Sequence, residues 1–285
     1  MKYPSEINFK KEKDGICVCY KDNSEVKYSL DIWAISYLLN EKLYQDRKEN
    51  IVHLPVTDRT MALRIFFLQH LFKNIVFDVA NAGDFKEIED IVHDNGKKYI
   101  TYSTGFPPRG KRKTKEALIE QYLSEDLSRL SETEFAGSNK PMTQFPANIF
   151  EEQISKKNRV TRKFWIDILS VNNFNQLSVI ELKTGANCPL DILMQAIDYG
   201  IYCHLFKEHI ADSFFGGVPL LGKNKIAIYC VVERFHPGLV GRDDIKGILP
   251  LLQQNDLFDL ILFEIRTTSG KIEGKPVIVY DSRSR

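Results

Sequence analysis

The chain has 285 residues and a formal net charge of +1, from 39 basic and 38 acidic side chains. Hydrophobic residues make up 43% of it and charged residues 27%, which is the mixture of an ordinary globular protein and excludes a disordered or collagen-like chain. Because the charges balance over the whole chain, a nucleic-acid or membrane partner would have to be met by a local patch of charge.

The cysteines and the apolar segments bear on where the protein works. The chain has five cysteines and no C-x-x-C pair, which fits neither a disulfide framework nor a structural zinc site. No apolar run reaches the roughly 18 residues that a membrane helix needs, and the N-terminal residues lack the apolar core of a secretory signal. We therefore expect a cytoplasmic protein without a membrane partner.

Residues 1–140 are expected to form an additional α+β region, because strand-like and helical segments alternate there. The clearest expected elements are helices over 29–43, 61–72 and 114–130 and a strand over 74–79. Residues 136–148 contain two prolines and a glycine among small polar residues, a composition typical of a connector. We expect two domains, 1–140 and 141–285. The role of the first is open, and we expect it to supply any contact with a second copy or a protein partner.

Two apolar runs, 165–169 and 177–183, predict a β-hairpin. Asp167 interrupts the first run. Because side chains alternate between the faces of a strand, Glu181 and Lys183 share one face of the second, and pairing of the strands brings Asp167 to them. Two carboxylates and an amine are costly to bury unpaired, and a divalent cation bound by the carboxylate oxygens resolves that cost.

These charged residues also have plainer interpretations. Asp167 can be a strand-edge acid paired with Arg162 or Lys163, and Glu181 and Lys183 can form a surface ion pair on one strand face. Other acid-x-lysine triplets occur in the chain. Glu181 and Lys183 differ from these triplets because they lie at the end of an apolar strand with a second acid-bearing strand upstream. This position favours a functional site.

The hairpin lies between two expected helices. A helix is expected from Pro189 onward, because proline suits a first helical turn and apolar residues then recur at steps of three and four. Gln195 and Tyr199, four residues apart, share a face of it. Before the hairpin, residues 145–154 predict a helix with Glu151 on its apolar side. Tyr199 can instead be a core residue, and Glu151 a capping or surface residue.

The order of these elements resembles the core of the PD-(D/E)XK nuclease superfamily, nearest its RecB-like branch, whose helix carries a Q-x-x-x-Y motif. The residues that carry the resemblance are Glu151, Asp167, Glu181-Leu182-Lys183 and Gln195 to Tyr199. The match covers about residues 145–235, with 225–232 as the next core strand, and we expect strands over 257–265 and 276–280 to extend the sheet. Ile166 stands where the superfamily name has proline. The resemblance implies an α/β fold with a restriction-endonuclease-like core, which is a mixed central sheet flanked by helices.

The resemblance also implies a catalytic site. The ligands that it implies for Mg²⁺, with Mn²⁺ able to substitute, are Glu151, Asp167, Glu181 and the carbonyl of Leu182. Lys183 would orient or activate the attacking water, and Gln195 and Tyr199 would position the substrate or brace Lys183. No iron–sulfur cluster is expected, because the late cysteines are widely spaced along the chain, at Cys188, Cys203 and Cys230.

The expected activity is that of a metal-dependent nuclease that hydrolyses phosphodiester bonds in DNA. A local basic run would bind the nucleic-acid backbone, and it consists of Lys156, Lys157, Arg159, Arg162 and Lys163. The plainer interpretation of this run is a solvated helix end. The alternative function is a catalytically inactive nuclease-like module that binds nucleic acid or a protein partner.

Overall fold

The computed structural model of the chain describes residues 1–21, 28–46, 48–55, 59–79, 88, 90–92, 99–103, 114–185, 189–220, 225–252, 256–269 and 271–284. The chain divides into two compact units. Unit 1 comprises Met1–Asp90, Pro189–Met194 and Phe235–Asn255, and unit 2 comprises Ile91–Cys188, Gln195–Arg234 and Asp256–Arg285. The connector expected near residue 140 lies inside unit 2, and independent folding of residues 141–285 stays a prediction.

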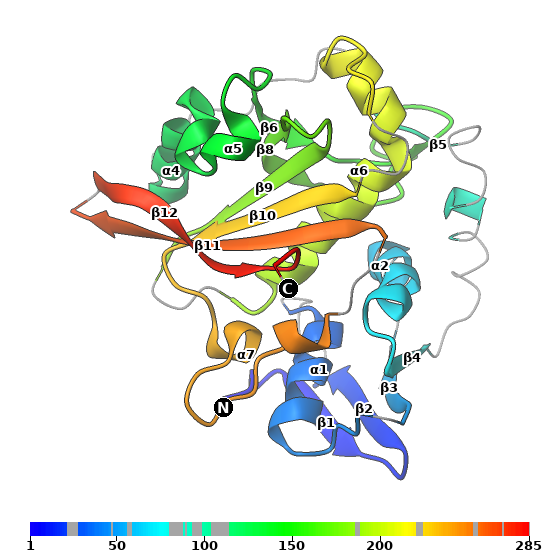
Figure 1. Ribbon diagram of the computed structural model, residues 1–285. Helices are drawn as coiled ribbons and strands as arrows, with labels where there is room; N and C mark the ends of the chain where they lie inside the picture. Colours follow the sequence, from blue (N-terminus) through cyan, green and yellow to red (C-terminus); the bar gives the residue numbers. More distant parts are fainter. Residues whose placement is uncertain are drawn as a thin grey trace. The chain divides into compact units, whose positions relative to one another are not determined.

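Unit 1 is built on a four-stranded sheet of order β1-β2-β3-β4 (Figure 1). Its strands are β1 (Ile7–Lys11), β2 (Gly15–Tyr20), β3 (Asn50–Leu54) and β4 (Ile75–Val79). Strands β2, β3 and β4 are parallel, whereas β1 runs antiparallel to β2. Its helices are α1 (Leu30–Asn40), α2 (Arg59–Leu71), α7 (Pro237–Val240) and the 3₁₀ turn η2 (Leu249–Leu251). The predicted helices over 29–43 and 61–72 and the predicted strand over 74–79 are thus confirmed as α1, α2 and β4.

Unit 2 contains a six-stranded mixed sheet of order β12-β11-β10-β9-β8-β6. Its strands are β6 (Met142–Pro146), β8 (Trp165–Val171), β9 (Leu177–Lys183), β10 (Ile226–Val232), β11 (Phe258–Thr268) and β12 (Lys271–Asp281). Strands β9, β10 and β11 are parallel, and the other neighbours are antiparallel. The predicted hairpin and the three predicted strands that follow it are therefore confirmed.

Helix α4 (Lys115–Glu125) covers one face of this sheet. Ile119 and Leu123 of the helix share a buried cluster with Ile180 and Leu182 of β9 and with alternate residues of the neighbouring strands. The predicted helix 114–130 is interrupted at Asp126. The carboxylate of Asp126 accepts a 3.0 Å hydrogen bond from the backbone N–H of Ser128 and caps a separate 3₁₀ turn, η1 (Leu127–Arg129). A short helix, α5 (Glu132–Phe135), follows.

Helix α6 (Ile192–Phe214) covers the opposite face, and it begins after a turn rather than at Pro189. A Cβ at Gly200 would lie 2.6 Å from Cδ1 of Ile228, so the absence of a side chain lets the helix approach β10. Ile228 alternates with the β10 residues that face α4, which places α6 on the other side of the sheet (Figure 1). None of the described helices combines the length and the apolar character needed to cross a membrane.

The prediction of a helix over residues 145–154 is wrong. These residues contain the end of β6 and the short strand β7 (Phe150–Glu151), which pairs with β5 (Tyr99–Ile100) in a two-stranded sheet. The backbone of this segment binds partners outside it: the N–H of Ala147 donates to the carbonyl of Phe164 at 3.2 Å, and the N–H of Ile149 donates to Oγ1 of Thr161 at 3.1 Å. Residues 144–150 are all buried, and a short apolar run does not distinguish a buried strand from a helix.

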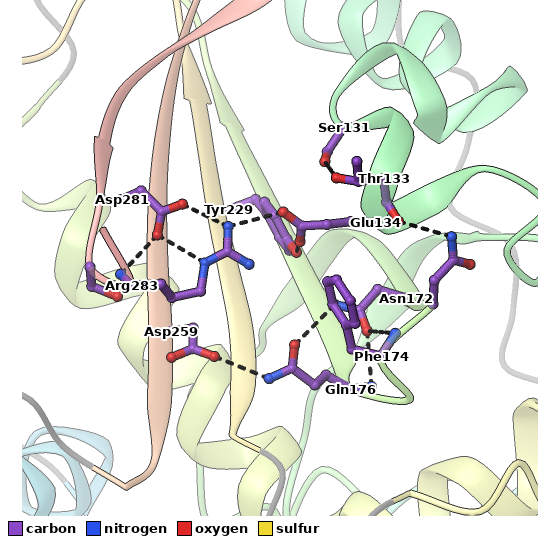
Figure 2. Close-up of polar contacts among 12 residues, drawn as sticks. Ser131, Thr133, Glu134, Asn172, Phe174, Gln176, Tyr229, Asp259, Asp281 and Arg283 are labelled. Carbon is purple, nitrogen blue, oxygen red and sulfur yellow. Dashed lines mark hydrogen bonds and ion pairs between the residues drawn. The ribbon is translucent and has the colours of Figure 1, made fainter. Parts of the chain in front are cut away.

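A polar cluster joins α5 and the C-terminal residues to the sheet (Figure 2). Glu134 accepts hydrogen bonds from the hydroxyl of Tyr229 and, at 2.9 Å, from the guanidinium of Arg283. Arg283 also donates to both carboxylate oxygens of Asp281, at 2.9 and 2.7 Å. Each carboxylate in this cluster is satisfied, so we regard the cluster as a structural element that fixes the C-terminal segment.

Candidate active site

Asp167 and Glu181 lie opposite each other where two strands separate. Strands β8 and β9 pair from Val171 and Leu177 up to Ile168 and Ile180, and the next residues in that antiparallel register are the two acids. Ile168 and Ile180 belong to the cluster under α4, so along their strands the two acids alternate with residues of that cluster. The hairpin thus brings Asp167 to Glu181, as its sequence pattern predicts.

Both carboxylate oxygens of Asp167 are held in place. Oδ2 accepts a hydrogen bond of 2.9 Å from the backbone N–H of Leu182, and Oδ1 accepts one of 3.0 Å from the side-chain amide of Gln144. Asp167 as a whole residue is only 6% exposed. An acid held this way has a fixed orientation, which is the requirement for a group that binds a cation or a reacting phosphate.

Glu181 is a buried acid with one unsatisfied oxygen. It is 1% exposed, and its Oε1 accepts a hydrogen bond from Nζ of Lys183, whereas Oε2 has no hydrogen-bond partner among the described residues. Burial, together with the negative charge of Asp167, raises the pKa of Glu181 well above its usual value. A buried polar atom without a partner is costly, and a cation at this position would satisfy it.

Lys183 places a positive charge beside the carboxylate of Glu181. Its Nζ also donates a hydrogen bond of 3.0 Å to the carbonyl of Leu182, and its side chain is 24% exposed. Burial lowers the pKa of Lys183, but the carboxylates of Glu181 and Asp167 outweigh burial and raise it. The amine is therefore a protonated ammonium beside the two acids.

The structure adds two residues that the sequence did not single out, Glu120 of α4 and Gln144 of β6. The amide nitrogen of Gln144 donates to Oε2 of Glu120 as well as to Asp167. Glu120 follows the buried Ile119 on the predicted helix 114–130, which was the one signal available for it. Nothing in the sequence marked Gln144.

Gln195 and Tyr199 come from α6, and the amide of Gln195 donates a 2.7 Å hydrogen bond to the hydroxyl of Tyr199. Tyr199 is 2% exposed, and the ring of Phe164 meets its ring edge-on with centroids 5.4 Å apart. Burial raises the pKa of Tyr199, and the charges of Glu181 and Asp167 raise it further. The phenol therefore keeps its proton close to the two acids.

Glu151 is placed elsewhere. It lies in the two-stranded sheet with its backbone N–H bound to the carbonyl of Asn158 at 2.8 Å. The structure has Glu151 on strand β7 rather than on a helix, and its role as a metal ligand stays a prediction. Its position on a helix beside the hairpin was the reason for proposing it, and that helix does not exist.

The predicted basic run lies on the loop between β7 and β8. Lys156, Lys157, Arg162 and Lys163 are exposed and Arg159 is half-buried. The ammonium of Lys163 lies 5.6 Å from the ring centroid of Trp165, which begins β8 two residues before Asp167. The loop therefore presents several cations on the segment that leads into the acid-bearing strand.

The residues around Glu181 fit a hard divalent cation by chemistry. Asp167, Glu181 and the carbonyl of Leu182 all offer oxygen, and Mg²⁺ typically takes one or two carboxylates and keeps several waters. Among the described residues no three His, Cys, Asp or Glu side chains form a ready-made metal-binding group. Of the three late cysteines, Cys203 and Cys230 are buried, and Cys188 lies outside the described residues.

The chain matches no protein-family model, and searches of curated proteins and of solved structures give no match either. What the site can do therefore has to be inferred from its own residues.

Proposed function

We propose that the protein is a metal-dependent nuclease that hydrolyses phosphodiester bonds, with DNA as its substrate. The observation that carries this proposal is the buried Oε2 of Glu181, which lacks a hydrogen-bond partner among the described residues and belongs to an acid beside Asp167 and Lys183. An unsatisfied carboxylate oxygen next to a second acid and an ammonium is an arrangement suited to a cation and an anionic substrate.

The order of elements in unit 2 supports a restriction-endonuclease-like core of the PD-(D/E)XK type. Helix α4 is followed by β6, by β8 with Asp167, by β9 with Glu181 and Lys183, by α6 with Gln195 and Tyr199, and by β10. The acids lie at the end of the β8–β9 ladder, and α4 and α6 cover the two faces of the sheet. In this assignment α4, rather than the segment around Glu151, is the helix that precedes the acid-bearing strands.

The cation would be held by Asp167, Glu181 and the carbonyl of Leu182, with Glu120 as a further acid beside Asp167. Mg²⁺ is the cation that this set suits, and Mn²⁺ can replace it. When bound, such a cation neutralises charge that develops on the phosphate and lowers the pKa of a coordinated water. Release of the Lys183 ammonium from Leu182 would free that carbonyl for the cation.

Lys183 and Tyr199 have roles of their own in this proposal. The ammonium of Lys183 orients the attacking water and stabilises negative charge on the phosphate oxygens. Tyr199 keeps its proton because burial and the neighbouring acids raise its pKa, so it acts as a hydrogen-bond donor. The amide of Gln195, bound to the hydroxyl of Tyr199, sets the direction in which that proton is donated.

The exposed lysines and arginine of the loop between β7 and β8 would bind the phosphate backbone. Interactions of this kind carry little sequence information and depend strongly on salt. Their position directly before β8 puts them on the segment that leads to Asp167.

Labelled DNA and RNA, each single- and double-stranded, test the proposal when incubated with the full chain in Mg²⁺, in Mn²⁺ and in EDTA. We expect cleavage of DNA that EDTA and the Lys183→Met substitution both abolish. Binding without cleavage in either metal would instead identify the catalytically inactive module. Cleavage that survives in EDTA would reject the metal site.

A further inference from the structure

A single amide nitrogen connects two acids from different elements. Nε2 of Gln144 donates to Oδ1 of Asp167 on β8, at 3.0 Å, and to Oε2 of Glu120 on α4. The nitrogen of a glutamine side chain carries two hydrogens, one for each acid. Because both partners are acids that accept hydrogen bonds, the nitrogen rather than the oxygen of the amide must face them.

The backbone of Gln144 is unusual for its position. Its φ is +52°, which non-glycine residues seldom adopt, in the middle of β6. Its neighbours Thr143 and Phe145 pair regularly with Ile168 and Ile166, and only the pair between them, Gln144 and Asp167, is missing from the ladder. The side chain of Gln144 is nevertheless buried. A local distortion in an otherwise regular strand thus accompanies the hydrogen bonds that Gln144 makes to the acids.

We propose that Gln144 is a positioning residue that sets the spacing between the carboxylates of Glu120 and Asp167. The two acids belong to a helix and a strand whose mutual packing is apolar, so the packing alone does not fix where their carboxylates lie. The Gln144 amide does so by binding both. The positioning role deepens the proposed function. One consequence rests on that function, namely that the correct spacing of the carboxylates strengthens binding of a divalent cation.

The variants Gln144→Met and Gln144→Gly separate the amide from the backbone. Methionine is close to glutamine in length and has no N–H, and it keeps the cost of the left-handed backbone. Glycine also removes the amide but adopts a positive φ without cost. A control is Ser269→Gly, at an exposed turn residue whose φ is +50°. If the amide positions the acids, both Gln144 variants bind Mn²⁺ more weakly than the wild type. If only the backbone conformation matters, Gln144→Gly binds Mn²⁺ as the wild type does.

The affinity of the full chain for Mn²⁺ is measured by titration calorimetry, with Asp167→Asn to identify the site. We expect both Gln144 variants to bind Mn²⁺ about 10- to 100-fold more weakly than the wild type, as is usual when a group that orients ligands is lost. We expect Ser269→Gly to bind as the wild type does, and Gln144→Gly to unfold at a higher temperature than Gln144→Met. Wild-type affinity in Gln144→Gly would overturn the proposal.

A crystal structure of metal-free Gln144→Gly keeps the proposal testable if the wild type binds no Mn²⁺, an outcome that would reject the proposed function. We expect the Glu120 carboxylate to move away from Asp167 by about 1 Å or more, a displacement large enough to matter to a catalytic site. If Glu120 keeps its position without the amide, the positioning role is refuted whatever the metal affinity.

Discussion

The backbone N–H of Leu182 donates a hydrogen bond of 2.9 Å to Oδ2 of Asp167, across the end of the β8–β9 ladder. The carbonyl of Leu182 accepts a hydrogen bond of 3.0 Å from Nζ of Lys183. The side chain of Leu182 is buried under α4. One residue therefore fixes an acid and an amine through its backbone, while its side chain belongs to the core. Because a side-chain substitution at residue 182 leaves both hydrogen bonds in place, the chemistry has to be tested at the charged residues around it.

Lys183→Met should reduce cleavage of DNA by about 100- to 10,000-fold, the range typical of a lost acid–base or charge-stabilising group. The variant should stay folded, because the raised pKa of Glu181 lets that carboxyl take up a proton when the ammonium is gone. Single-turnover cleavage rates and circular-dichroism unfolding measure the two effects.

The matched control is Lys10→Met in unit 1. Lys10 and Glu12 form the same lysine–glutamate pair two residues apart, at 2.9 Å, but both side chains are exposed, and exposed pairs contribute little. Cleavage by this variant should equal that of the wild type. A similar loss of cleavage in both variants would show that lost charge, rather than the site, is responsible.

Glu120→Gln and Glu151→Gln should differ. Glu120 is bound through Gln144 to Asp167, so loss of its charge should lower cleavage and Mn²⁺ affinity by about 10- to 100-fold. Glu151 lies in the β5–β7 sheet, and its substitution should leave both quantities unchanged. The two variants remove the same charge and are compared by titration with Mn²⁺ and by cleavage at saturating metal. The reverse ranking would identify Glu151, on strand β7, as the third acid of the site in place of Glu120.

The hairpin was predictable because its signal is local. Alternation within 165–171 and 177–183 determines which side chains share a face, and a short turn determines which residues face each other. Asp167, Glu181 and Lys183 therefore follow from spacing alone. Likewise, the recurrence of apolar residues marked α6, and with it the pair Gln195 and Tyr199.

The third acid was not predictable in the same way. An apolar run over 145–150 has no period that separates a buried strand from a helix, and the backbone N–H groups of this run donate to Thr161 and Phe164, which lie beyond it. Glu120 meets Asp167 only through a glutamine on another strand. Hydrogen bonds among three elements leave no pattern in any one segment, so the sequence could not reveal this part of the site.

The loop between β7 and β8 should affect binding of DNA through charge alone. In the double variant Lys156→Gln, Lys157→Gln, the slope of log affinity against log salt should fall in magnitude by about 0.9 for each phosphate that a lysine no longer neutralises, or about 2 in total. Fluorescence anisotropy of a short duplex over a series of KCl concentrations measures this slope.

A double variant with the same change of net charge, Lys271→Gln, Lys275→Gln, is the control, since both lysines are exposed on the edge strand β12. It should leave the slope as in the wild type. Equal effects of the two double variants would mean that the duplex responds to the net charge of the protein rather than to the loop.

Stability should depend on pH through the cluster at the C-terminal end of unit 2. Burial alone would raise the pKa of Asp281, but hydrogen bonds from the side chain and backbone of Arg283 outweigh burial and lower it. A carboxyl with a lowered pKa stabilises the fold above its unfolded pKa of about 3.9, and this contribution is lost as the pH falls through the lower, folded value. Arg283→Met removes the side-chain part of this cause, while the backbone N–H of residue 283 can still donate to Asp281, and it leaves the carboxylates of Asp281 and Glu134 without the guanidinium.

We expect Arg283→Met to lower the free energy of unfolding at pH 7 by about 1–3 kcal/mol, the usual cost of lost hydrogen bonds to charged groups that are mostly buried. The difference from the wild type should shrink as the pH falls below 4, because Asp281 then takes up a proton in the unfolded chain, whereas in the folded wild type its lowered pKa delays protonation. Urea unfolding followed at several pH values between 3 and 7 measures this convergence, and Arg266→Met, at an exposed position of β11, serves as the control. A difference that stays constant over this range would show that Arg283 stabilises the fold by packing rather than by pairing with Asp281.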